Sequence, residues 1–464
     1  MVPVKERRVS MKKQIPRFMI AAAGSGSGKT TITCALLMAL RRRGRRPTSC
    51  KCGPDYIDTM FHKSVLGTPS TNLDLYFFDD DTAKYLLAEN SSQGDITVIE
   101  GVMGYYDGLG IDSTEASSYN VAGVTGTPVV LVVNARGAAL SVLATIKGFR
   151  EFRADSGIRG VILNNCTQST YEVLKGVIER EFKGEIVPLG FMPNMKDCSV
   201  ESRHLGLVTA AEIKDLNEKL DKLGEQALAN IDMEALEKIA ETAPALEFDP
   251  PEIEVICPEN GSLRIGVARD KAFCFYYEDS LKLLEKMGAE LVDFSPLEDG
   301  KLPEDIDGLY LGGGYPELYA DILSGNESML SSIRSAVNGG LPTIAECGGF
   351  MYLTESIAGR KMVGVLPGEC SDKSKLMRFG YVKIKALKDN MLMPEGHEIA
   401  AHEFHHWDCT ENGSDYLAVK RNGRTWNAVT ATDTLYAGFP HFNFYTDLEL
   451  AENYLKACMK YRDK

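Results

Sequence analysis

Short apolar runs rich in β-branched residues alternate with helix-period patterns along the first half of the chain. The runs predict strands over residues 17–23, 97–101, 127–135, 160–164 and 185–192. Regular alternation of strands and helices is typical of a parallel sheet with helices on both faces. The first half is therefore predicted to be a doubly wound α/β domain.

The same pattern restarts after a break. A polar, helix-favouring stretch over 210–241 gives way to a proline-rich segment that contains Pro244, Pro250, Pro251 and Pro258. New strands are then predicted over 263–268, 290–294, 308–311 and 341–345, with a helix that places Tyr277, Leu281, Leu284 and Met287 on one face. We expect a disordered extension over 1–16, a domain over 17–243, a linker over 244–262 and a second α/β domain over 263–464. Met11 is an alternative start of translation.

Composition and charge restrict the class of protein. A chain of 464 residues exceeds what one hydrophobic core usually supports, which favours two domains. The formal charge of −14 disfavours nucleic acid and membranes as partners, so an anionic substrate would need local Arg and Lys side chains. With neither a signal peptide nor a long apolar run in the sequence, we expect a cytoplasmic protein.

The cysteines and the densest basic run have structural interpretations. Eleven cysteines at irregular spacings favour reduced thiols over a disulfide framework. The close pair Cys50 and Cys52 is a weak metal signal, and a structural role at the end of a strand is favoured. The basic run over 41–46 follows a helical stripe, so we expect the C-terminus of a helix there, with Gly44 just beyond it.

A glycine-rich segment, GSGSGKT at residues 24–30, follows the first predicted strand and precedes an amphipathic helix. Strand, loop and helix in this order favour a P-loop, because the loop N–H groups and the helix N-terminus point at the phosphates. Lys29 would neutralise the β- and γ-phosphates, and the Thr30 hydroxyl would bind Mg²⁺. Ala23 stands where the usual pattern has glycine, but three glycines remain. The alternative is a glycine loop without function.

Acidic residues that could complete a metal site occur in three places. Glu100 ends an apolar strand, and the carboxyl edge is where α/β sheets place functional groups. A predicted turn carries Lys51, Asp55 and Asp58, and Asp107 lies in a second turn. Each carboxylate alone is more often a turn or cap residue. Together they favour a site for Mg²⁺ and substrate.

A cysteine in the second half is a candidate nucleophile. Cys347 follows a predicted strand and precedes Gly348 and Gly349, which is typical of a tight strand-to-helix turn whose helix N-terminus lowers the thiol pKa. The glycines at 312–314 could donate N–H groups to an oxyanion. The base could be His441 or a member of the histidine cluster at 402–406. A structural buried cysteine is the alternative.

Eight motifs from about Phe18 onward give a specific resemblance: GSGSGKTT, KCGPDYIDTMFHKSVLG, EGVMGYYDG, GVILNN, ESRHLGL, LGGGYPELYA, AECGGFMYL and HEFHHW. In these motifs the chain resembles the glutamine amidotransferase family that includes cobyrinic acid a,c-diamide synthase and cobyric acid synthase. The resemblance implies a dethiobiotin synthetase-like P-loop domain followed by a class I glutamine amidotransferase domain. It also implies cobalamin biosynthesis: ATP phosphorylates a corrin carboxylate, and ammonia from glutamine displaces phosphate at side chain c and then a.

The resemblance assigns roles to individual residues. The nucleotide-binding residues it implies are Gly24, Gly26, Gly28, Lys29, Thr30, Thr31, Lys51 and Asn164, with Lys51 facing the γ-phosphate and Asn164 reading adenine. The implied ligands of Mg²⁺ are Thr30, Asp55 and Glu100. The implied catalytic residues are Cys347 as nucleophile, His441 as base, and Asp58 and Asp107 in substrate activation.

The chain departs from the family pattern at two places. Ala400 and Ala401 stand where the family usually has Arg-Gly, and Asn443 stands where a second histidine or a glutamate is usual. We therefore expect a Cys–His dyad, without Asn443 as a charged third member.

Several functions share these motifs. The expected small-molecule substrates are cobyrinic acid or a related tetrapyrrole, ATP and glutamine. A nickel-sirohydrochlorin a,c-diamide synthase of the same family is an alternative, and a P-loop regulatory protein with an inactive second domain is another. The sequence leaves a homodimer open.

Overall fold

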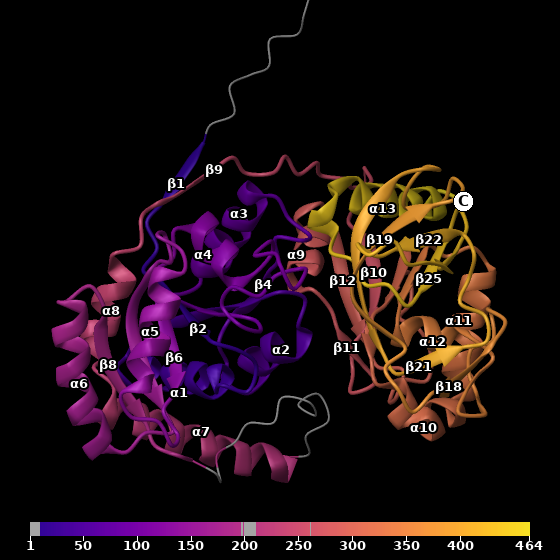
Figure 1. The fold of residues 1–464 in the computed structure, drawn as a ribbon. Coiled ribbons are helices and arrows are strands. Elements are labelled where there is room, and N and C mark those ends of the chain that lie inside the picture. Colours follow the sequence, from indigo (N-terminus) through magenta and orange to yellow (C-terminus); the bar gives the residue numbers. More distant parts are fainter. Residues whose placement is uncertain (1–9, 196–197, 199–209, 260) are drawn as a thin grey trace, which may run out of the picture. The chain divides into compact units, whose positions relative to one another are not determined.

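The computed structural model describes residues 10–195, 198, 210–259 and 261–464 (Figure 1). Contacts divide the chain into two compact units, Met1–Pro251 and Glu252–Lys464. The division falls within the range predicted as a linker. The motif at 201–207 lies outside the described residues.

Unit 1 is built on a parallel sheet that has seven strands among the described residues. In their order across the sheet the strands are β4 (Ser70–Leu73), β3 (Pro47–Cys52), β5 (Ile96–Glu100), β2 (Arg17–Ala22), β6 (Val129–Asn134), β7 (Ile158–Asn164) and β8 (Val187–Met192). The five strands predicted in this half are confirmed within two residues at each end. β3 and β4 were not predicted, because polar residues and cysteines interrupt their apolar pattern.

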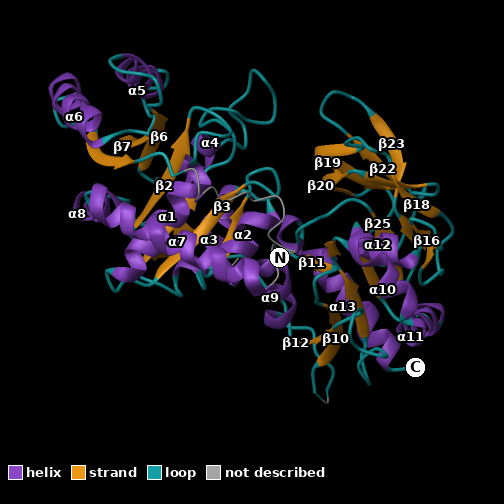
Figure 2. Cartoon of the chain, turned by 90° about the horizontal axis from the view of Figure 1, so that it is seen from below, coloured by secondary structure: helices purple, strands orange, loops and turns teal. Residues whose placement is uncertain are grey.

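Helices cover both faces of this sheet. They are α1 (Lys29–Arg42), α2 (Tyr56–Ser64), α3 (Asp80–Ser91), α4 (Ser118–Thr125), α5 (Ser141–Glu151), α6 (Gln168–Phe182), α7 (Ala210–Asn230) and α8 (Met233–Glu241). In Figure 2, α5 and α6 lie on one side of the sheet and α1, α7 and α8 on the other. Side chains of α1, α7 and α8 share one buried apolar cluster with the sheet. The doubly wound architecture is thus confirmed.

The end of α1 follows from its sequence. Gly44 adopts φ +81° just beyond the helix, and its N–H donates to the carbonyl of Arg41, as expected for a glycine after a helix C-terminus. The basic side chains on either side of Gly44 are paired: Arg43 and Arg45 both donate to Glu237 of α8. The prediction of a structural role for this basic run is confirmed.

The N-terminal segment is ordered where the structure describes it. β1 (Met11–Lys13) pairs antiparallel with β9 (Leu246–Phe248). Arg17 is fully buried, and its guanidinium donates to the carbonyls of Thr125 and Pro244. The prediction of a disordered extension is therefore wrong for residues 10–16, and the predicted linker contains a strand. Local composition could not indicate this, because the two paired strands are far apart in the sequence.

Unit 2 contains a second, mostly parallel sheet. Over the described residues its strands in spatial order are β12 (Ala289–Phe294), β10 (Leu263–Ala268), β13 (Gly308–Leu311), β15 (Thr343–Glu346), β25 (Leu435–Gly438) and the antiparallel β24 (Thr430–Ala431). Its helices are α9 (Glu278–Lys286), α10 (Ala320–Gly325), α11 (Glu327–Asn338), α12 (Gly348–Leu353) and α13 (Leu448–Arg462), with short 3-10 helices η3 (Pro316–Tyr319) and η4 (Phe444–Thr446). The predicted strands and the helix around Leu281 are confirmed.

Smaller sheets complete unit 2. An antiparallel sheet has the order β20 (Glu398–His405), β19 (Arg378–Ala386), β22 (Tyr416–Val419) and β23 (Thr425–Ala428). A mixed sheet has the order β17 (Arg360–Lys361), β16 (Ser356–Ile357), β18 (Glu369–Asp372) and β21 (Trp407–Cys409), and β11 (Phe273–Phe275) pairs with β14 (Gly313–Gly314). Cys370 and Cys409 form a disulfide between β18 and β21, so the expectation of reduced thiols throughout is wrong for this pair. The spacing of the cysteines in the sequence does not indicate that these two residues lie opposite each other on paired strands.

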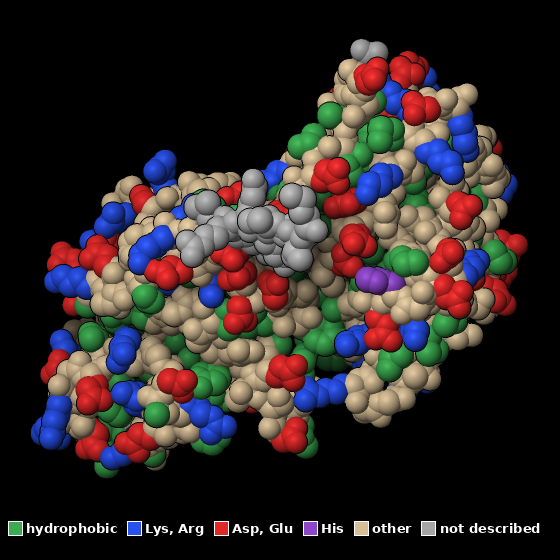
Figure 3. All heavy atoms as spheres, turned by 90° about the horizontal axis from the view of Figure 1, so that it is seen from above, with side chains coloured by type: hydrophobic (Ala, Val, Ile, Leu, Met, Phe, Trp, Pro, Cys, Tyr) green, Lys and Arg blue, Asp and Glu red, His purple; other side chains and the backbone are tan. Residues whose placement is uncertain are grey.

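The surface carries both signs of charge. Acidic and basic side chains are interspersed on the face shown in Figure 3. In the part of the chain that the structure describes, none of the helices has the length and apolar character needed to cross a bilayer.

Candidate active sites

The glycine-rich loop lies between β2 and α1, and its glycines meet two structural requirements. Gly26 and Gly28 adopt φ values of +74° and +94°, which favour glycine. A Cβ on Gly28 would lie 2.2 Å from Nδ2 of Asn164. That amide donates to the carbonyl of Ser27 at 2.9 Å, so the end of β7 supports the loop. The predicted adenine-reading role of Asn164 remains a prediction.

Lys29 and Thr30, the first two residues of α1, form hydrogen bonds that link the glycine-rich loop to neighbouring segments. Lys29 Nζ donates to the carbonyls of Gly24 at 3.1 Å and Met103 at 2.5 Å, and burial lowers its pKa. The Thr30 hydroxyl donates to Oε1 of Glu100 at 2.6 Å. Thr31 lies half-buried in the same helical turn.

A buried charge network lies beside Thr30. Lys51 is on β3, not in a turn as predicted, and its Nζ contacts Oε1 of Glu100 at 2.8 Å and Oδ2 of Asp58 at 2.5 Å. Burial lowers the pKa of Lys51, but the two carboxylates outweigh this effect and raise it above its usual value. Burial also raises the pKa of Glu100. Opposite charges at hydrogen-bonding distance make this burial tolerable.

Two of the three predicted metal ligands meet in the structure. The Thr30 hydroxyl and the Glu100 carboxylate are hydrogen-bonded, and these are oxygen donors of the kind that hold Mg²⁺ together with phosphate oxygens. Asp55 instead caps α2, because its Oδ1 accepts from the N–H groups of Ile57 and Asp58. Burial and the nearby Asp58 carboxylate raise the Asp55 pKa to about 6. Among residues the structure describes, no three His, Cys, Asp or Glu side chains converge as a metal-binding group. The Thr30 hydroxyl and the Glu100 carboxylate fit a cation that phosphate oxygens also coordinate.

Asp107 closes a turn next to the loop. Its Oδ2 accepts from the N–H of Gly104 at 2.9 Å, and the side chain is exposed. The neighbouring carbonyl of Met103 accepts from Lys29, so the same turn touches the P-loop lysine. A role for Asp107 in substrate activation remains a prediction.

Cys347 occupies a strained turn between β15 and α12. Its φ of +49° and ψ of −100° are unusual for a residue with a side chain, and strain of this kind is common at nucleophiles. The N–H of Cys347 donates to the carbonyl of Gly438 at 2.7 Å. A Cβ on Gly349 would lie 2.1 Å from the Leu311 carbonyl oxygen, so the predicted need for small neighbours is confirmed there.

His441 lies between the thiol and a carboxylate. Its ring is hydrogen-bonded to Cys347, and Nδ1 lies 3.0 Å from Oε2 of Glu346. Burial lowers the His441 pKa, but the charge of Cys347 and hydrogen bonds to Cys347 and Glu346 raise it to about 10. Tyr310 donates its hydroxyl to the other oxygen of Glu346 at 3.0 Å. The arrangement is a Cys–His–Glu triad, not a dyad.

The sequence interpretation missed Glu346. Consecutive residues of a strand normally point to opposite faces, so Glu346 was not expected to share a site with Cys347. The positive φ at Cys347 ends that alternation. Asn443, in contrast, accepts from Ser280 and from the N–H of Tyr445, which is a capping role.

The histidine cluster flanks this triad. The backbone groups of His402 and His441 exchange two hydrogen bonds, at 2.8 and 2.9 Å, so β20 pairs with the segment that carries the base. Burial, followed by the charge of His441, lowers the His402 pKa to about 3, which keeps that ring neutral. His405 stacks on Phe439 with ring centroids 3.9 Å apart.

The glycines at 312–314 abut the triad. The N–H of Gly349 donates to the carbonyl of Gly312 at 3.0 Å. A Cβ on Gly313 would lie 2.6 Å from Cε1 of His441, so only glycine fits beside the imidazole. Donation to an oxyanion by this segment remains a prediction.

Comparison with known proteins covers both units. The CobQ/CobB/MinD/ParA nucleotide binding domain family matches residues 18–208, and the CobB/CobQ-like glutamine amidotransferase domain family matches residues 264–449. The chain is 40% identical to the cobyrinate a,c-diamide synthase of Listeria monocytogenes over 94% of this chain and 97% of the relative. It is also similar to proteins of that name from Clostridium acetobutylicum (40% identity, 94% and 99%) and Thermoplasma volcanium (36%, 97% and 99%).

Proposed function

Because this chain belongs to the cobyrinate a,c-diamide synthase family, we propose that it amidates the a and c carboxylates of cobyrinic acid, using ATP and ammonia from glutamine. The observation that carries the proposal is the pairing of two chemistries in one chain. Unit 1 has a P-loop joined to a buried Lys–Glu–Asp network, and unit 2 has a Cys–His–Glu triad. The protein is thus a glutamine-hydrolysing carbon–nitrogen ligase.

The reaction in unit 1 makes and consumes an acyl phosphate. A substrate carboxylate attacks the γ-phosphorus of ATP, and the bond to the β–γ bridging oxygen breaks to release ADP. Ammonia then attacks the acyl carbon, phosphate leaves, and the nitrogen loses one proton, which leaves the amide. The amines of Lys29 and Lys51 are suited to stabilise charge on the transferred group. Mg²⁺, held by Thr30 and Glu100, would neutralise phosphate charge when bound.

The reaction in unit 2 supplies the nitrogen. The Cys347 thiolate attacks the glutamine side-chain carbonyl, and His441 donates a proton to the departing ammonia, which leaves a glutamyl thioester. His441 then accepts a proton from water, whose attack releases glutamate and restores the thiolate. Glu346 holds Nδ1 of His441 and stabilises the imidazolium.

Further parts of the proposal rest on the family resemblance. They are a Mg²⁺ requirement, nucleotide contacts by Lys51 and Asn164, and substrate activation by Asp58 and Asp107. The proposed cytoplasmic location rests instead on the sequence, which has neither a signal peptide nor a long apolar run.

The test is product mass after turnover with cobyrinic acid, ATP and glutamine. Two successive amidations are expected, each replacing a carboxyl OH with NH₂. Nickel-sirohydrochlorin serves as the competing macrocycle under the same conditions. Amidation of that macrocycle alone would reject the corrin assignment, and absence of glutamine-dependent ATP hydrolysis with either would favour a regulatory protein.

Glu346→Gln is expected to lower kcat for glutamine hydrolysis on the order of 100-fold, because His441 loses the charge that stabilises its imidazolium. Since Glu346 helps to raise the His441 pKa, the alkaline limb of the kcat/KM profile should move to lower pH. Glutaminase assays across pH measure both effects. Glu355→Gln, at an exposed carboxylate of the same unit, is the matched control and should leave the profile unchanged. An unaltered profile in Glu346→Gln would contradict the triad.

A further inference from the structure

Helix α5 has one buried apolar face, and exposed apolar side chains lie just beyond both of its ends. Val142, Leu143 and Ile146 are buried in the core of unit 1. Just beyond the two ends of the helix, Leu140 is 65% exposed and Phe152 is 57% exposed. A helix on the surface of a domain normally carries polar residues on its outer face. The outer face of α5 therefore suits an apolar ligand.

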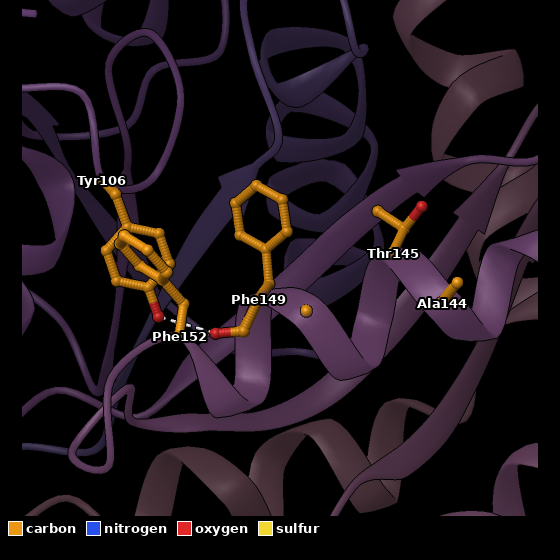
Figure 4. Close-up of a pocket in the computed structure, with 6 residues that line it drawn as sticks. Tyr106, Ala144, Thr145, Phe149 and Phe152 are labelled. Carbon is orange, nitrogen blue, oxygen red and sulfur yellow. Dashed lines mark hydrogen bonds between the residues drawn. The ribbon is translucent and has the colours of Figure 1, made fainter.

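This outer face forms one wall of a pocket of about 480 Å³ (Figure 4). The pocket is lined by Tyr106, Ala144, Thr145, Gly148, Phe149 and Phe152. Tyr106 comes from the loop after β5, and its hydroxyl donates to the carbonyl of Phe149 at 2.6 Å. The Tyr106 ring stacks on Phe149 at 5.7 Å and meets the edge of Phe152 at 5.0 Å between centroids. Small residues on the helix leave these three rings as the main contact surface.

The loop that carries Tyr106 also contacts the proposed phosphate-transfer site. Tyr106 immediately precedes Asp107, whose carboxylate closes the turn at Gly104. One residue earlier, the Met103 carbonyl accepts from Lys29 of the P-loop. Four consecutive residues, 103–106, therefore run from the contact with the P-loop lysine to the aromatic wall.

Arg153 places a positive charge beside Phe152, one of the residues that line the pocket. The guanidinium of Arg153 lies 4.4 Å from the centroid of the Phe152 ring. Apolar faces beside a guanidinium suit a ligand with an apolar ring system and carboxylates at its periphery.

We propose that the aromatic pocket at α5 binds one face of the polycarboxylate tetrapyrrole, with Phe149 and Phe152 against the ring and Arg153 near its peripheral carboxylates. This orientation lets another carboxylate extend along the 103–107 turn toward the P-loop. The proposal rests on the proposed function. The rim guanidinium and the continuity with Asp107 favour this ligand over a second copy of the chain.

Phe152→Ala tests the assignment, because an exposed ring can be removed without opening a cavity in the core. With ammonia as nitrogen source, the KM for cobyrinic acid should rise about tenfold, as expected for loss of one aromatic contact, while the KM for ATP stays within about twofold. Equilibrium dialysis that follows the visible absorption of the corrin measures binding separately, and should give a similar loss of affinity.

Gly148→Gln is a second variant. A Cβ at Gly148 meets no atom within 4 Å, so the substitution inserts a side chain into the pocket without a clash and should also raise the KM for cobyrinic acid. The matched control is Val173→Ala, at an exposed apolar residue of α6 outside this pocket, and it should behave as wild type.

The possible results distinguish failure of the pocket assignment from failure of the proposed function. If wild type amidates cobyrinic acid but both pocket variants keep its KM and affinity, the pocket assignment is overturned and the function stands. If Phe152→Ala changes only the sedimentation coefficient, the face contacts a second copy and the assignment is likewise overturned. If wild type neither binds nor amidates cobyrinic acid, the proposed function fails, and the assignment falls with it.

Discussion

Cys347→Ser is expected to reduce glutamine-dependent amidation by about 10³-fold or more while leaving ammonia-dependent amidation intact. The hydroxyl of serine is a far weaker nucleophile than the thiolate paired with His441, so the glutamyl thioester is not formed. Free ammonia bypasses this step, because the reaction in unit 1 needs only the nitrogen nucleophile.

The measurement is the rate of amide formation at saturating glutamine and, separately, at high ammonium concentration and alkaline pH. The KM for ATP with ammonia is the internal control for folding. Cys274→Ser, at a cysteine outside the triad, is the matched variant and should retain both rates. Loss of both activities in folded Cys347→Ser protein would contradict the assignment of separate chemistries.

Lys29→Met is expected to give the complementary result, a loss of amidation by about 10²–10³-fold with either nitrogen source. Methionine retains most of the side-chain volume but not the amine, so charge on the transferred phosphoryl group is no longer stabilised from this position. The Cys–His–Glu triad is in the other unit and does not depend on this amine.

Phosphate release and amide formation with ammonia measure this effect, and glutamine hydrolysis in the absence of macrocycle reports on the triad. Lys175→Met, at a half-exposed lysine of α6 near Glu179, changes the same group and should leave every rate unaltered. Normal ammonia-dependent amidation by Lys29→Met would show that the P-loop does not serve the activation step.

Local patterns predicted the parts of this protein that short segments determine. The P-loop between β2 and α1, the helix end at Gly44, and the strand before Cys347 each depend on neighbours within a few residues. The prediction of two α/β folds follows from the same alternation of apolar strands and helices.

The missed features depend on partners far along the chain. β1 is a short polar strand that is stable because β9 pairs with it. Lys51 was predicted to lie in a turn, because the polar residues and cysteines around it do not form the apolar pattern of a strand. In the structure this segment is β3, which pairs with β5. Glu346 joins the triad because β25 lies beside β15 and brings His441 to it. In each case the deciding contact is set by tertiary pairing, which local periodicity does not encode.

The two backbone hydrogen bonds between His402 and His441 couple the backbone of the catalytic base to the antiparallel sheet that contains β20. Because β20 pairs with β19 along eight residues, a displacement of that antiparallel sheet would be transmitted to the imidazole. Substitutions on β19 should therefore be assessed by turnover as well as by folding. Thermal stability alone would underestimate their effect.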